Sequence, residues 1–394
     1  MLGIARSILQ RGPAKVPLEE RFVFDRPLVL FQSDDWGRVG VRDREGFEQL
    51  RSAGIALGEK PYDFYTLETA EDVFALSELL MRHRDSIGRP ACLEMNFILA
   101  NVDFQQSAAD AFDKIHLRPL ADGLPGNWER PKLLEAYAQG IADGLFFASL
   151  HGVTHFCRPA VEACLAEDSE RSTLLRKLWK AETPYIHWRM PWIGYEYWNP
   201  DCQPAQRFLT AEMQRRLIRE AAEIFKRLFS TPAISACAPG YRANNDTHSA
   251  WAQNGIRVSQ NGTRGFSPPR LDHHGLLQVS RTIDFEPATD SSFSVQKCLR
   301  LAEGCFSRGI PAVISVHAIN FHSSLKDFRS TTLQNLDQFL FALEAKYPKL
   351  LYIHDADLLQ VVQTGKYECA QGSITVPAKK QNFSMAQFET RSRA

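Results

Sequence analysis

The sequence lacks several features that mark particular classes of protein. Its 394 residues carry no formal net charge, with 46 Lys and Arg against 46 Asp and Glu, which excludes the general basic surface of a nucleic-acid-binding protein. No apolar run approaches the roughly 18 residues that a membrane helix needs, so we expect no membrane span. Residues 1–23 lack the apolar core of a secretory signal peptide, and we therefore expect a cytoplasmic protein.

The eight cysteines include no C-x-x-C pair, which argues against a zinc knuckle and against a disulfide framework. We expect most of these thiols to be small buried apolar groups. No Ser/Gly-rich linker and no internal repeat divides the chain. We therefore predict one catalytic domain over residues 20–365, followed by a polar tail over residues 366–394.

Short apolar runs that end in polar residues alternate with longer stretches of helical periodicity. The strands predicted from the apolar runs cover residues 28–32, 92–99, 145–150, 233–237, 256–259, 276–280, 312–316 and 350–353. The clearest predicted helices cover residues 70–83, 130–142, 158–166, 211–229, 294–307 and 332–346. Repeated β-then-α units indicate an α/β fold, either a parallel sheet or a barrel with outer helices, with its chemistry at the carboxyl ends of the strands.

Polar residues follow several of these predicted strands. The first strand runs into Asp34 and Asp35, two adjacent carboxylates that repel each other unless a cation or a base relieves them. The third runs into His151 and His155, which would share one face if the segment is helical. Neutral imidazoles suit a divalent transition metal. His317 directly follows the seventh predicted strand. Taken singly, the Asp pair could be a turn or a helix cap, and His317 could be a packing residue.

The segment after the fourth predicted strand contains Pro239 and Gly240, which form a tight turn that could direct backbone N–H groups at an oxyanion. Together, the strand ends supply one carboxylate and two imidazoles that could bind a metal. One further carboxylate and one further imidazole remain for acid–base chemistry. Metal-assisted hydrolysis needs this set of groups. The aromatic segment 187–201 could offer ring faces to a sugar or could simply pack.

These motifs resemble those of the polysaccharide deacetylase superfamily, the metal-dependent carbohydrate esterases related to chitooligosaccharide deacetylases. The resemblance rests on four segments in family order, and an uncharacterised branch is suggested by residues 97–104. The segments are Asp34-Asp35-Trp36-Gly37, His151-Gly152-Val153-Thr154-His155, Ala238-Pro239-Gly240-Tyr241 and Val316-His317.

The resemblance implies an irregular (β/α) barrel of about seven parallel strands and a role for each matched residue. Asp35, His151 and His155 would hold a divalent metal, most commonly zinc, with Fe(II), Mn or Co also suited to these ligands. Asp34 would be the general base and His317 the general acid, with Asp284 the expected partner of that histidine.

Gly240 and Tyr241 would support the oxyanion through their backbone N–H groups. The arginine that the family places before this turn to orient the base corresponds to Cys237 here. Arg242 is the expected substitute for it.

The function expected from these residues is removal of an N- or O-acyl group from a sugar, an oligosaccharide or a polysaccharide precursor. One alternative keeps the barrel but cleaves a glycosidic bond or a non-sugar amide. Adjacent Asp34 and Asp35 cannot readily flank a glycosidic bond from both sides, so glycoside cleavage would need a distant acid such as Asp246 or Asp284. A non-catalytic sugar-binding protein is the third possibility. The sequence leaves the oligomeric state open.

Overall fold

A twelve-stranded sheet forms the centre of the computed structural model, which describes residues 20–185, 190–369 and 372–382. The path through the sheet is β11-β12-β2-β3-β6-β7-β8-β10-β9-β1-β16, with β13 paired to β2. Its strands are β1 (Glu20–Phe24), β2 (Leu28–Trp36), β3 (Leu93–Phe97), β6 (Phe146–Leu150), β7 (Ser235–Cys237), β8 (Val258–Asn261), β9 (Arg270–Leu271), β10 (Leu277–Ser280), β11 (Ile283–Asp284), β12 (Ala312–His317), β13 (Leu351–Tyr352) and β16 (Ala378–Asn382).

From β11 to β10 every neighbouring pair along this path is parallel, whereas β9, β1 and β16 are added in antiparallel pairs. The sheet curls into an incomplete barrel with β11 at one end of the path and β16 at the other. The predicted irregular barrel of parallel strands with outer helices is therefore confirmed. Two small antiparallel pairs lie outside it: β4 (Ala100–Val102) with β5 (Leu117–Pro119), and β14 (Lys366–Cys369) with β15 (Gly372–Thr375).

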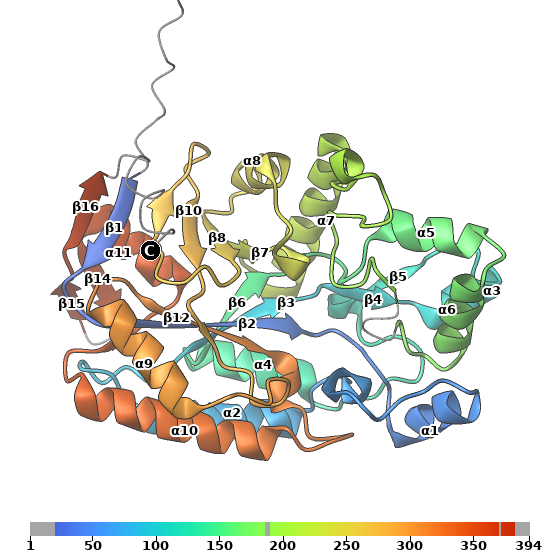
Figure 1. The fold of residues 1–394 in the computed structure, drawn as a ribbon, viewed down its shortest axis with the longest axis horizontal. Helices are drawn as coiled ribbons and strands as arrows, with labels where there is room; N and C mark the ends of the chain where they lie inside the picture. The colour runs from blue at the N-terminus through green and yellow to red at the C-terminus, as the bar shows by residue number, and fades with distance from the viewer. Residues whose placement is uncertain (1–19, 186–189, 370–371, 383–394) are drawn as a thin grey trace, which may run out of the picture.

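Helices cover the outside of the sheet (Figure 1). α2 packs against both α4 and α10, and α10 packs against α9, so these four helices form one continuous layer. The helices of the described residues are α1 (Arg44–Ser52), α2 (Ala70–Arg82), α3 (Phe104–Ala109), α4 (Leu133–Ala142), α5 (Arg158–Ala166), α6 (Glu170–Lys180), α7 (Ala211–Phe229), α8 (Asn245–Gln253), α9 (Val295–Phe306), α10 (Arg329–Lys346) and α11 (Asp355–Thr364).

Local sequence explains the best-defined elements. In α7, Thr210 caps the first turn by accepting a hydrogen bond from the Met213 N–H, and the buried residues Leu217, Ala221 and Phe225 recur at helical spacing. All nine residues of β2 are buried, as expected for a central parallel strand covered on both faces. The cysteines behave as predicted, since six of the seven described as free are buried.

The described part of the segment expected to be a polar tail, residues 366–369 and 372–382, contains three strands. β14 follows α11 directly, and Tyr367 and Val376 are fully buried in a second apolar cluster with residues of β1 and β10. β16 then pairs with β1 along its whole length, from Glu20 opposite Asn382 to Phe24 opposite Ala378. Among the described residues, no helix has the length and apolar character of a membrane span.

Candidate active site

The two adjacent carboxylates reach the same site because β2 is irregular where they occur. Successive side chains of a regular strand point to opposite faces of the sheet. Between Ser33 and Trp36 the pairing of β2 with β3 shifts register, and Asp35 has a φ of 77°, in the left-handed region. The Tyr65 hydroxyl donates a hydrogen bond of 2.8 Å to the Asp35 carbonyl and holds this turn. The bulge therefore brings both carboxylates to one end of the strand.

Asp34 is held by a buried arginine that sequence analysis did not identify. Arg281 lies between β10 and β11, is fully buried, and binds Asp34 through both of its terminal nitrogens, with Nη1–Oδ2 at 2.7 Å and Nη2–Oδ1 at 2.6 Å. Asn96 donates to Oδ1 at 2.6 Å, and the Tyr241 hydroxyl donates to Oδ2 at 3.0 Å. Each carboxylate oxygen therefore accepts two hydrogen bonds.

This environment fixes the charge of Asp34. Burial alone would raise the pKa of a carboxyl group, but the Arg281 guanidinium overcomes it, and the pKa of Asp34 lies well below its ordinary value. Asp34 is therefore ionised at neutral pH. The position of Arg281 directly after the predicted strand at 276–280 was the available signal for this residue.

Asp35, His151 and His155 converge as the sequence predicted. Asp35 Oδ1 lies 3.0 Å from His155 Nε2 and 3.6 Å from His151 Nε2, and all three side chains are buried. The two histidines do not share a helical face, because residues 151–157 form a loop in which Gly152 has a φ of 93°. A Cβ at Gly152 would lie 2.3 Å from Glu196 Oε2, so only glycine fits this position.

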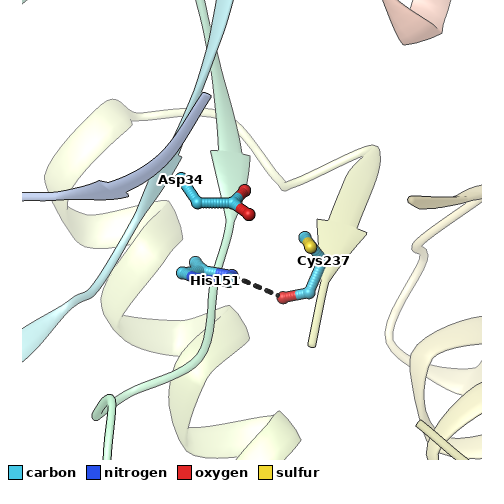
Figure 2. Close-up of side chains that lie close together, drawn as sticks. All are labelled: Asp34, His151 and Cys237. Atoms are coloured by element: carbon cyan, nitrogen blue, oxygen red, sulfur yellow. Dashed lines mark hydrogen bonds between the residues drawn. The ribbon is translucent and has the colours of Figure 1, made fainter. Parts of the chain in front are cut away.

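The His151 ring is oriented by a backbone carbonyl. Its Nδ1 lies 2.9 Å from the Cys237 carbonyl oxygen, which can only accept, so Nδ1 carries a proton and Nε2 is the nitrogen whose lone pair can bind a metal (Figure 2). That lone pair faces Asp35 Oδ1. An imidazole lone pair directed at a carboxylate oxygen favours a cation between them.

A second group that could hold a metal consists of Asp34, His151 and Cys237, the side chains drawn in Figure 2. Both oxygens of Asp34 already accept hydrogen bonds from Arg281, and burial together with Asp34 raises the pKa of the Cys237 thiol well above its ordinary value. A protonated thiol and a fully bonded carboxylate are poor ligands. The group with Asp35 is therefore the better metal site.

Asp35, His151 and His155 fit a divalent ion. One carboxylate oxygen and two imidazole nitrogens lie within 4.8 Å of one another, which is the donor chemistry of many catalytic zinc sites. Asp35 Oδ1 is buried and no well-aligned hydrogen bond reaches it, although His155 Nε2 lies 3.0 Å away, so a cation held between them would complete the coordination of this oxygen.

Arg38 is the second buried arginine of the site. Its Nη2 lies 3.2 Å from Asp35 Oδ2, and its Nη1 lies 2.8 Å from His155 Nδ1. The guanidinium also lies 3.9 Å from the centre of the Tyr65 ring and donates to the Tyr185 hydroxyl at 3.0 Å. Burial, outweighing the attraction of Asp35, lowers the pKa of His155 to about 4, so this ring is neutral near pH 7.

His317 stands opposite Asp34 in the register of β12 and β2. Its Nδ1 donates to Glu286 Oε1 at 2.6 Å, and its Nε2 lies 3.8 Å from Asp34 Oδ2. Burial alone would lower the pKa of His317, but Glu286 raises it to about 9. Glu286, and not Asp284 as expected, is the partner of this histidine; Asp284 is exposed and accepts a hydrogen bond from Thr263 instead.

The turn after β7 contacts the site through a side chain, and not through the backbone N–H group of Tyr241 as expected. The Tyr241 N–H donates to the Ala238 carbonyl at 2.8 Å and is not available to an oxyanion, whereas the Tyr241 hydroxyl contacts Asp34. Arg242 does not replace the missing arginine, because its guanidinium lies 4.9 Å from the centre of the Trp198 ring and makes no contact with Asp34. Gly240 is needed for close packing, since a Cβ there would lie 2.5 Å from the Gly194 carbonyl.

The aromatic segment supports the histidine loop. Trp192 and Tyr197 are buried, and Glu196 accepts hydrogen bonds of 3.0 Å from the backbone N–H groups of Val153 and Thr154. His187 and Trp188 lie outside the described residues. Half of the described residues of this segment, 190–201, are therefore buried and pack against the rest of the protein.

The sequence matches no protein-family model and no curated protein. By structure, the chain resembles a putative polysaccharide deacetylase from Mycobacterium smegmatis, with a TM-score of 0.44, 11% identity and coverage of 91% of this chain and 95% of that one. It also resembles a probable polysaccharide deacetylase from Pseudomonas aeruginosa PAO1, with a TM-score of 0.42, 11% identity and coverage of 85% and 91%. A structure titled Puue allantoinase gives a TM-score of 0.44, 10% identity and coverage of 92% and 99%.

A putative and a probable polysaccharide deacetylase are thus among the solved structures that this chain resembles.

Proposed function

We propose that this protein is a metal-dependent hydrolase that removes an N- or O-acyl group, such as acetyl, from a sugar or a polysaccharide precursor. The observation that supports this most directly is the grouping of an ionised Asp34 and a protonated His317 beside Asp35, His151 and His155. An ion held by these three ligands would polarise an acyl carbonyl and make a bound water more acidic.

Asp34 is the group placed to accept a proton from the attacking water. Its oxygens are fully bonded, so one donor must leave before it can accept. Tyr241 is the donor that can leave most readily, because the residue is 37% exposed on a surface turn, whereas Arg281 and Asn96 are buried. Its departure would also break the 2.6 Å hydrogen bond that Arg281 Nη1 donates to its hydroxyl. Movement of the Tyr241 hydroxyl away from Oδ2 would open one lone pair toward the substrate.

His317 is the group placed to protonate the departing amine or alcohol. Its Nδ1 is bonded to Glu286, so Nε2 carries the proton that can be donated, and the side chain is 25% exposed and accessible to a substrate. With its pKa raised to about 9, the ring is protonated near neutral pH, as a general acid requires.

The test is release of acetate from N-acetylated and O-acetylated sugars and chito-oligosaccharides by the purified protein, before and after chelation and after return of zinc. We expect activity that is lost on chelation and restored by metal. Asp34→Asn should keep the metal and lose about 10²- to 10⁴-fold in turnover. Near-normal turnover by Asp34→Asn, or full activity without metal, would contradict the proposal.

A further inference from the structure

We propose that Arg38 competes with the metal ion for Asp35 and His155, so that a metal enters this site only when the Arg38 side chain withdraws. This inference rests on the proposed metal site and concerns how that site is loaded. It is carried by the two contacts of the guanidinium with residues of the ligand set, one at 2.8 Å and one at 3.2 Å.

The contact with His155 places the proton on the wrong nitrogen for a metal ligand. Arginine has N–H donors and no acceptor, so His155 Nδ1 must accept from Arg38 Nη1. A neutral imidazole that accepts at Nδ1 carries its proton on Nε2, the atom that lies 3.0 Å from Asp35 Oδ1. A metal needs the Nε2 lone pair, and it needs the proton on Nδ1 instead. His151, whose Nδ1 donates to a carbonyl, has the opposite and suitable arrangement.

The contact with Asp35 already supplies the positive charge that the carboxylate needs. Arg38 and Asp35 are 3% and 2% exposed, so their charges interact with little screening by water. A divalent ion at the same carboxylate would lie close to the guanidinium and would be repelled by it. Arg38 therefore neutralises part of the Asp35 charge that would otherwise attract the ion.

The surroundings hold Arg38 in this position. The Tyr65 ring faces the guanidinium, the Tyr185 hydroxyl accepts from Nη1, and the cavities that Arg38 lines beside them are only about 10 Å³ each, no larger than one water needs. The guanidinium cannot swing into empty space, so its withdrawal must move these tyrosines. Metal binding should therefore be weaker than the three ligands alone would give.

The experiment compares metal affinity in metal-free wild-type protein, Arg38→Gln and Arg281→Gln, by titration with Zn²⁺ and with Co²⁺, whose absorption reports coordination. We expect Arg38→Gln to bind both ions about 10- to 100-fold more tightly than wild type. Groups that support metal ligands typically cost affinity of this size when they are removed, and the sign is reversed here because Arg38 competes with the metal. Arg281→Gln is the matched control. It removes an equally buried cation from the neighbouring Asp34 without touching His155, and it should change affinity much less.

Equal or weaker binding by Arg38→Gln would overturn the proposal, and so would an equal gain in Arg281→Gln, which would indicate general electrostatics. Because turnover is not measured, tight binding that is insensitive to Arg38 would leave the proposed hydrolase function standing. If no variant binds metal, both the proposal and the metal dependence fail.

A second measurement needs no variant. Nitrogen-15 spectra of the imidazoles in metal-free wild-type protein should show the His155 proton on Nε2 and the His151 proton on Nδ1. Addition of Zn²⁺ should move the His155 proton to Nδ1. A His155 proton on Nδ1 before metal is added would overturn the proposal, even if Arg38→Gln fails to fold.

Discussion

Glu286 accepts a hydrogen bond of 2.6 Å from His317 and is the main reason that the pKa of this histidine is raised to about 9. A raised pKa keeps the ring protonated at neutral pH, and the protonated fraction falls as the pH rises through about 9. Activity that depends on this proton should therefore be lost on the alkaline side.

Glu286→Gln tests this relationship through the pH profile of kcat/KM. Removal of the carboxylate leaves burial to dominate, so the pKa of His317 should drop and the alkaline limb should move down by about 1–3 pH units. Asp284→Asn is the matched control, because Asp284 is bonded to Thr263 and does not contact His317. If the alkaline limb of the profile moves in Asp284→Asn but not in Glu286→Gln, Asp284 would be the partner of His317, as first expected.

His317→Ala separates general-acid catalysis from other roles of the histidine. An amine leaves poorly unless it is protonated, whereas the phenolate of an activated ester needs no proton. The variant should lose about 10²- to 10⁴-fold on an N-acyl sugar and far less on a nitrophenyl ester. Equal losses on the two substrates, measured under the same conditions, would assign His317 to substrate binding.

Arg281→Gln should destabilise the fold, because it leaves the Asp34 carboxylate buried without a cation. Loss of one partner of a buried ion pair typically costs about 3–5 kcal/mol of the free energy of unfolding. The low pKa of Asp34 stabilises the wild-type protein above the pKa of an unfolded aspartate, and this contribution is lost as the pH falls. The difference in the free energy of unfolding between variant and wild type, measured by urea denaturation, should therefore become smaller below about pH 4. A difference in the free energy of unfolding that does not change with pH would show that the charge of Asp34 is not its cause.

Asp35 should tolerate asparagine better than alanine for a reason that concerns only the backbone. Its φ of 77° lies in a region that asparagine and aspartate adopt more readily than other non-glycine residues. Asp35→Ala and Asp35→Asn both remove the charge that faces Arg38. We expect the alanine variant to be less stable than the asparagine variant by about 1–2 kcal/mol in urea denaturation. Equal stability would show that the turn relaxes.

Apolar runs predicted the sheet well, because its parallel strands are buried on both faces. β2 and β12 lie where the runs at 28–32 and 312–316 placed them, each extended at its carboxyl end by the polar site residues. The strands that were missed are short or lie at an edge, as β11 and β16 do, and polar or alternating residues there give no continuous apolar signal.

The rule that site residues follow the ends of predicted strands identified Asp34, Asp35, His151 and His317. It depends only on where each apolar run stops. It could not identify Glu286 in preference to Asp284, because Asp284 ends the short strand β11, Glu286 comes two residues later, and the path of the chain decides which one reaches the histidine. Arg38 was missed because a single arginine three residues beyond a carboxylate is also typical of an ordinary surface ion pair. Its role depends on burial, which the sequence does not show.

The pairing of β1 with β16 gives the folding of this chain a fixed order. These strands stand at opposite ends of the described sequence, so β1 has no β16 to pair with until translation has passed residue 382. During synthesis, β1 remains an open sheet edge while most of the barrel can already assemble. Nascent chains halted before β16 should therefore aggregate or recruit chaperones more than chains released just after it.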